Sequence, residues 1–143
     1  MVGRRVTVIA IVTNLLLATC LLATSYIQLG VVVGLSMYRT CGKVAIVVIR
    51  PVRLWSWRDL NSIKVGDLVV LRRYQPFEFW LKRVKYRVGE WLWVEGEHPQ
   101  SLDSRDVGWV SIFSVYGKVV RVFVVERPSP AELQEIQLES RQN

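Results

Sequence analysis

Hydrophobic and polar positions divide the chain into a long uncharged start, a middle of short apolar runs and a polar end. No charged side chain occurs from residue 6 to residue 38. Residues 6–29 alone exceed the about 20 apolar residues that cross a bilayer as a helix. The pattern therefore predicts a membrane anchor over residues 1–30. Arg4 and Arg5 keep the N-terminus on the side of insertion and place the remainder across the membrane.

A cleaved signal peptide is the alternative interpretation of the same stretch. Small residues at 18–20 and 23–25 are compatible with a cleavage site. The apolar stretch is long for a signal peptide, however, and it runs almost directly into the motif around Ser36. We therefore favour an anchor that is retained in the mature protein.

The middle of the chain, residues 31–127, has the pattern of an all-β domain. Short apolar runs rich in β-branched and aromatic residues alternate with Gly, Pro, Asn and Asp. We predict strands over residues 44–49, 67–71, 91–94 and 118–125. No long amphipathic helix pattern occurs between Thr40 and Glu126. The fold class predicted is thus mainly β, with one N-terminal transmembrane helix.

The C-terminal tail, residues 128–143, is polar and carries the signature of a helix start. Ser129 is placed as N-cap, Pro130 in the first turn, and Glu132 closes a capping box. A short helix in a solvated tail is the simplest prediction for this segment.

Composition narrows the classes of function. A net charge of +7 favours an anionic partner, either nucleic acid or an anionic lipid surface. Residues 50–58 mix tryptophan with arginine, which suits both partners. Given the anchor, we expect the lipid bilayer and no nucleic acid. The single histidine and the absence of a Cys-x-x-Cys pair argue against a metal site, and no cofactor is implied.

Two residues stand out as candidates for chemistry. Ser36 follows the apolar segment directly, and Lys82 lies among large apolar neighbours, with Phe77, Phe79 and Trp80 just before it. A lysine with an ordinary pKa of about 10.4 is a poor base at neutral pH. Burial disfavours the ammonium and lowers that pKa, so a buried lysine can deprotonate a serine hydroxyl. A surface lysine whose stem covers a strand is the alternative.

An ordered set of motifs gives these residues a context. The motifs are Ser36-Met37-Tyr38-Arg39-Thr40, Gly66-Asp67-Leu68-Val69, Lys82-Arg83-Val84, Gly96-Glu97-His98 through Ser101-Leu102-Asp103-Ser104-Arg105 to Gly108-Trp109-Val110, and Gly117-Lys118. In this order the set resembles the signal peptidase I family of membrane-bound serine proteases. The phrase Trp93-Val94-Glu95-Gly96-Glu97-His98 is most similar to mitochondrial inner membrane protease subunits, the second subunit slightly more than the first.

The resemblance implies a signal-peptidase-like all-β catalytic domain with a Ser36/Lys82 dyad. Ser36 would be the nucleophile and Lys82 the general base, with Ser101 orienting the lysine. Asp103 and Arg105, joined by Arg83, would form a supporting ion-pair cluster. The residues expected to meet the substrate are Gly34, Met37 and Leu81. His98 is expected to be a turn residue rather than a base.

The resemblance also implies a setting. The substrates would be proteins that carry a signal or sorting presequence, and a second protease subunit would be a partner. The location would be the mitochondrial inner membrane, with the catalytic domain facing the intermembrane space. A bacterial plasma membrane is the alternative.

Some positions depart from the family pattern. Arg39 occupies the usual proline after the nucleophile, which predicts a looser turn, and Glu97 replaces an aspartate. Gly34 lacks a hydroxyl that some bacterial members use, and the segment over residues 85–95 is short. Two other functions therefore stay open: a catalytically degenerate supporting subunit of a membrane protease, and a basic β-module at the membrane surface without chemistry.

Overall fold

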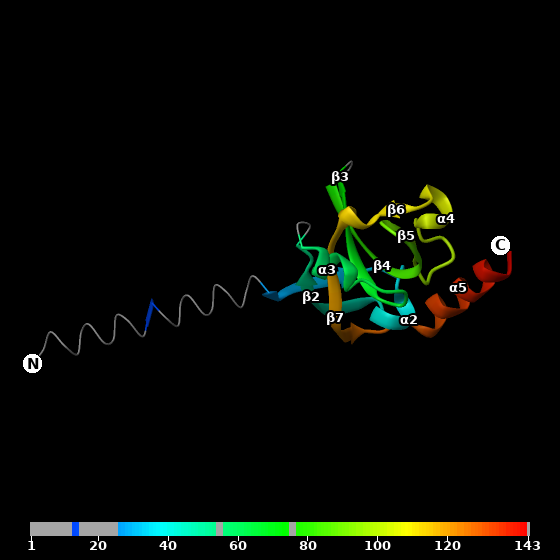
Figure 1. The fold of residues 1–143 in the computed structure, drawn as a ribbon. Coiled ribbons are helices and arrows are strands. Elements are labelled where there is room, and N and C mark those ends of the chain that lie inside the picture. Colours follow the sequence, from blue (N-terminus) through cyan, green and yellow to red (C-terminus); the bar gives the residue numbers. More distant parts are fainter. Residues whose placement is uncertain (1–12, 15–25, 54–55, 75–76, 143) are drawn as a thin grey trace, which may run out of the picture.

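The chain folds around one antiparallel sheet (Figure 1). The computed structural model describes residues 13–14, 26–53, 56–74 and 77–142. Seven strands form the sheet within these residues: β1 (Gln28–Val33), β2 (Val44–Pro51), β3 (Leu68–Tyr74), β4 (Phe77–Val88), β5 (Trp91–Glu95), β6 (Val110–Ser111) and β7 (Val115–Glu126). The prediction of a mainly β fold is confirmed.

Most of the predicted anchor lies outside the described residues, at 1–12 and 15–25. In the part of the chain that the structure describes, no helix is both long and apolar enough to pass through a bilayer. The prediction extended the anchor to residue 30, whereas Gln28, Leu29 and Gly30 form the first half of β1. Every residue of β1 has a partner in the antiparallel ladder with β2, from Gln28 opposite Ile49 to Val33 opposite Val44. This ladder satisfies the backbone of 28–30 as strand.

The order of the strands is β1-β2-β7-β3-β4-β5-β6. β1 and β4 are separated by three strands in this order, yet residues of both line one cavity. The sheet must therefore curl, which agrees with the right-handed twist of antiparallel sheets and with the register shifts in β2 and β7. The curl brings the far end of the apolar N-terminal run opposite the strand that carries Lys82.

Two groups of buried side chains fill the curled sheet. The first includes Met37, Cys41, Val47 and Leu81 and lies next to the cavity, several of whose lining residues belong to it. The second lies toward the β4–β5 end and contains Leu60, Ile63, Val69, Leu71, Val84, Leu92, Val94, Ile112 and Val115. The alternation of buried and exposed positions along β2 and β5 follows from the two-residue period of a strand.

The hairpin between β4 and β5 explains the short segment noted in the sequence. Only Gly89 and Glu90 connect the two strands, and Gly89 has φ 57°, a left-handed conformation that glycine adopts without a Cβ penalty. Residues 86–88 pair with 91–93 on each side of this two-residue turn, and a register shift between Val84 and Tyr86 leaves Lys85 without a partner in the β4–β5 ladder.

In the described part of the chain from residue 26 onward, helices are short except at the C-terminus. α2 (Tyr38–Cys41), α3 (Trp57–Asn61), α4 (Ser104–Val107) and the 3-10 turn η1 (Ile112–Ser114) have three to five residues each. This agrees with the missing helix pattern between residues 40 and 126. The helix expected after Ser129 is present as α5 (Pro130–Gln142), and its capping box forms between Ser129 and Glu132. The expectation of a solvated tail fails at Ile136, which is only 3% exposed.

Candidate active site

Lys82 is a buried cation on β4. It pairs with Val69 of β3, and its side chain is 4% exposed. Its Nζ donates a hydrogen bond of 2.5 Å to Ser101 Oγ, and the Trp80 ring centroid lies 5.8 Å from Nζ. Burial lowers the pKa of Lys82 below its ordinary value, because the ammonium loses its hydration, although the charge of Asp103 opposes this shift. Lys82 therefore loses its proton more readily than an exposed lysine does.

Ser36 lies in the turn between β1 and α2, and its backbone fixes that turn. The Ser36 carbonyl accepts hydrogen bonds from the amides of Glu97 and His98, at 2.6 and 3.2 Å. Just before it, Gly34 has φ 126° and donates its amide to the Lys43 carbonyl at 2.9 Å. The turn that carries Ser36 is thereby attached both to Lys43, just before β2, and to the loop that follows β5.

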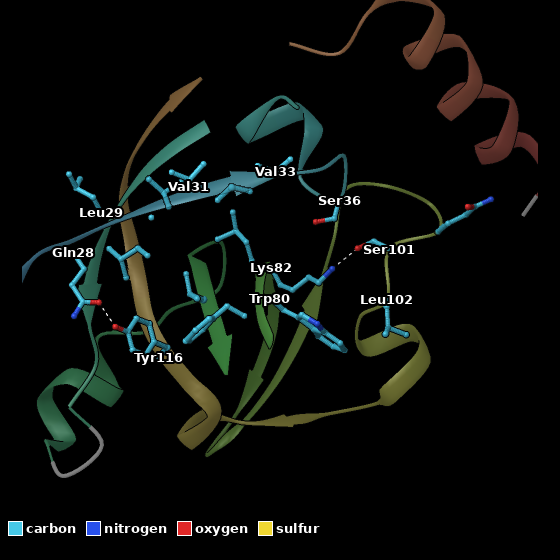
Figure 2. A pocket seen from close by; sticks show the side chains of 18 residues that line it. Gln28, Leu29, Val31, Val33, Ser36, Trp80, Lys82, Ser101, Leu102 and Tyr116 are labelled. Carbon is cyan, nitrogen blue, oxygen red and sulfur yellow. Dashed lines mark hydrogen bonds between the residues drawn. The ribbon is translucent and has the colours of Figure 1, made fainter. Parts of the chain in front are cut away.

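Ser36, Lys82 and Ser101 line one cavity of about 660 Å³. Figure 2 shows the three side chains together at one end of this cavity, with Lys82 and Ser101 joined by their hydrogen bond. Gly96 lies between the turns that carry the two serines. A Cβ at this glycine would collide with the Ser101 hydroxyl and lie 3.0 Å from the Ser36 carbonyl oxygen. Close approach of the two serines therefore requires glycine at position 96.

Asp103 and Arg105 form an ion pair close to Ser101 in the chain. Asp103 is fully buried and accepts hydrogen bonds from the Gly96 amide at 2.7 Å and from Arg105 Nε at 2.9 Å. Burial raises the pKa of Asp103, but the hydrogen bonds from the Arg105 guanidinium and from the amides of Gly96 and Arg105 outweigh it and hold the pKa below the usual value. The ion pair anticipated from the sequence is present, at 2.7 Å.

Arg83 belongs to a different cluster from the one predicted. Its guanidinium pairs with Glu97 at 3.3 Å and donates to Thr40 Oγ1 at 2.5 Å, rather than joining Asp103 and Arg105. The reason is strand alternation: Lys82 and Arg83 are neighbours on β4, so their side chains leave on opposite faces. Glu97 also accepts from the Thr40 amide at 2.9 Å and from the Thr40 hydroxyl.

Arg39 lies in α2 and does not prevent the turn after Ser36 from closing. The amides of Thr40 and Cys41 donate to the Met37 carbonyl at 3.1 and 2.7 Å. The Arg39 side chain is exposed and donates to the Tyr38 hydroxyl at 2.9 Å. Helical hydrogen bonds and the Thr40–Glu97 contact therefore hold a turn that lacks the family's proline.

The predicted site residues separate into those that line the cavity and those that do not. Ser36, Leu81, Lys82 and Ser101 line it, whereas Gly34 and Met37 are not among the lining residues. Met37 is 1% exposed and packs in the first core group, with Leu81. Its position beneath the lining follows from the tight turn, which directs Met37 inward.

Several cavity residues were not anticipated. Gln28 and Tyr116 lie at the end of the cavity remote from Ser36, and their side chains are hydrogen-bonded to each other (Figure 2). All residues of β1, from Gln28 to Val33, contribute to its lining. Of the apolar residues noted before Lys82, Phe79 and Trp80 line the cavity, while the Phe77 side chain lies outside the described residues.

Comparison of the chain with models of known protein families, with curated proteins and with solved structures finds no match.

Proposed function

We propose that this protein is a membrane-bound serine endopeptidase of the signal peptidase I type, which removes presequences by a Ser36/Lys82 dyad. One observation carries the proposal. Lys82 is buried, is hydrogen-bonded to a neutral hydroxyl rather than to a carboxylate, and lines the same cavity as Ser36. A lysine in this environment has a lowered pKa, which is the property required of a general base near neutral pH.

The chemistry follows from these positions. Neutral Lys82 accepts the proton of the Ser36 hydroxyl as Oγ attacks the scissile carbonyl carbon. The tetrahedral intermediate collapses, the C–N bond breaks, and the leaving amine takes the proton back from Lys82. Water, deprotonated by Lys82, then hydrolyses the Ser36 ester and restores the serine. The Ser36 amide is the proposed donor to the oxyanion.

The cavity suggests how a substrate would lie. β1 contributes residues 28–33 and β4 contributes residues 79–82 to its lining, so an extended peptide fits between two strand edges. The lining is largely apolar, with Val47, Ile49, Val70 and Leu81 at its base. Such a surface suits small apolar side chains beside the scissile bond.

The proposed setting rests on the sequence resemblance. The apolar residues before β1 would hold the enzyme in the mitochondrial inner membrane, with the domain facing the intermembrane space and a second protease subunit beside it. A bacterial plasma membrane is the alternative setting. Presequence-bearing proteins are the proposed substrates in either place.

Cleavage of a presequence-bearing protein by the detergent-solubilised full chain tests the proposal. Ser36→Ala and Lys82→Ala should each lower the rate by about three orders of magnitude or more, since nucleophile and base act as a unit. Lys85→Ala is the matched control, because Lys85 is an exposed lysine on the same strand. Equal cleavage by wild type and Ser36→Ala, or none by wild type with and without a partner subunit, would contradict a catalytic dyad.

A further inference from the structure

The C-terminal helix α5 packs behind the candidate active site. Its residues 136, 137 and 140 line a cavity of about 280 Å³ together with residues of α2 and of the loop over 97–105. Ile136 is 3% exposed, and Glu132, Ile136 and Glu139 follow each other at spacings of four and three, so they share one helix face. In Figure 1, α5 runs from the end of β7 alongside the part of the molecule that holds α2.

The start of α5 is ion-paired to Lys43, which is hydrogen-bonded to the turn that carries Ser36. Glu132 pairs with Lys43 at 2.9 Å, and the Lys43 carbonyl accepts the amide of Gly34, two residues before Ser36. Hydrogen bonds from the Ser129 amide and from Lys43 lower the pKa of Glu132 to about 2, so its charge is kept. This contact sets the position of α5 relative to residues 34–43.

The end of α5 reaches the loop that bridges the two serines. Glu139 Oε2 lies 3.7 Å from His98 Nε2. His98 Nδ1 accepts a hydrogen bond of 3.1 Å from the Gln100 amide, so the proton of a neutral imidazole is on Nε2, the nitrogen that faces Glu139. Glu139 Oε2 is buried and has no hydrogen-bond partner among the described residues, and His98 Nε2 faces it at 3.7 Å.

His98 is connected through its backbone to both serines of the site. Its amide donates to the Ser36 carbonyl at 3.2 Å, and its carbonyl accepts the Ser101 amide at 3.0 Å. A shift of His98 therefore changes the separation of the nucleophile from the residue that orients Lys82. Ser36 and Ser101 line the cavity that would hold the substrate, whereas neither His98 nor any residue of α5 is among its lining residues.

We infer that α5 is a brace for the active site, and that His98 and Glu139 are positioning residues that fix Ser36 and Ser101 relative to Lys82. The inference rests on the proposed function for its catalytic consequence. Its structural part, the dependence of the 96–101 loop on Glu139, can be measured without any activity. A brace that acts on geometry rather than on the substrate surface should affect kcat and leave KM nearly unchanged.

The first test compares Glu139→Ala with Glu135→Ala in the full chain. Glu135 is exposed on the same helix and has the same side chain, so it controls for the loss of a charge on α5. Glu139→Ala should lower kcat about tenfold with KM within about twofold, because small displacements of reacting groups are costly. His98→Ala should behave alike, whereas His98→Gln, which keeps an N–H donor toward Glu139, should recover most of kcat.

Hydrogen exchange separates the brace from the peptidase proposal. The amides of Glu97 and His98 donate to the Ser36 carbonyl, and the Ser101 amide donates to the His98 carbonyl, so a peptide over 96–102 reports the opening of the loop. In Glu139→Ala this peptide should exchange faster than in wild type and in Glu135→Ala. If Glu139→Ala changes neither the exchange rate nor kcat, the inference that α5 is a brace is wrong. A raised KM with unchanged kcat would also contradict it. If wild type and Ser36→Ala are equally inactive, the peptidase proposal fails and the exchange data alone decide on the brace.

Discussion

Lys82 and Arg83 are adjacent cations on one strand, and the structure gives them opposite surroundings. Lys82 is 4% exposed, with a serine hydroxyl as its hydrogen-bond partner. Arg83 lies on the other face of β4, paired with the Glu97 carboxylate and bonded to Thr40. No carboxylate among the described residues forms an ion pair with Lys82. One side of the strand thus favours loss of a proton, and the other holds a permanent charge.

The difference shows that burial alone does not indicate the role of a basic side chain, because its hydrogen-bond partners decide whether it stays charged. An arginine beside a carboxylate ties segments together, as Arg83 and Glu97 tie β4 to α2 and to the loop after β5. A lysine buried against a hydroxyl costs stability, because the ammonium is desolvated without a carboxylate in direct contact to offset the loss of hydration. Such a cost is expected where the group has a chemical use.

The largest predicted effect comes from giving position 82 a side chain that stays protonated, as Arg83 does. Lys82→Arg puts a guanidinium that does not deprotonate in the cavity, so cleavage should fall by about three orders of magnitude. Arg83→Lys, the mirror-image change, keeps a charge beside Glu97 and should cost less than about tenfold. Initial rates on one substrate measure both. Comparable losses in the two variants would show that the two faces do not differ in function.

An intermediate effect is predicted on the paired face. Glu97→Ala removes the carboxylate that pairs with Arg83 and accepts hydrogen bonds from Thr40, and should lower the free energy of unfolding by about 2 kcal/mol. Urea denaturation followed by tryptophan fluorescence measures it, with the exposed Glu90→Ala as control. A loss no greater than in the control would mean that the Glu97 cluster does not hold the three segments together.

The smallest predicted effect has the opposite sign. Lys82→Met removes the buried amine and should raise the free energy of unfolding by about 1 kcal/mol at pH 7 while abolishing cleavage. The pKa of Lys82 is lowered in the folded state, so the unfolded chain binds more protons between that pKa and the ordinary value of about 10.4, and wild-type stability rises with pH in this window. The gain of Lys82→Met should therefore shrink as pH increases toward 10. A gain independent of pH would contradict burial as the cause of the shift.

The sequence predicted which polar residues meet at the cavity better than it predicted what surrounds them. Ser36, Lys82 and Ser101 were identifiable because each lies in a short motif whose spacing is local, and the structure places all three on one cavity. The Gln28–Tyr116 contact joins residues 88 positions apart, so it depends on how the sheet curls and not on any local pattern. Arg83 was assigned to the wrong cluster because a list of charged residues does not show which face of a strand each one occupies.

The apolar start of the chain shows a different limit of sequence reasoning. Val31, Val32 and Val33 continue an uncharged run, and hydropathy alone does not mark where a membrane segment would give way to a strand. Pairing with β2 makes that distinction, and it depends on residues 44–49. The packing of Ile136 likewise needed a tertiary surface, since the polar composition of the tail indicated none.

The free edge of β1 has a consequence for the conformation of whatever binds there. Within the described residues, β1 pairs only with β2 and is the first strand in the sheet order, so its other edge faces the cavity region with unpaired backbone groups. Its six residues span about 20 Å when extended. A helix of six residues covers only about 9 Å and keeps its own backbone bonds. A helical segment can therefore pair with this edge only after it has unfolded into an extended conformation. The edge thus selects extended over helical segments of chain, whatever their side chains are.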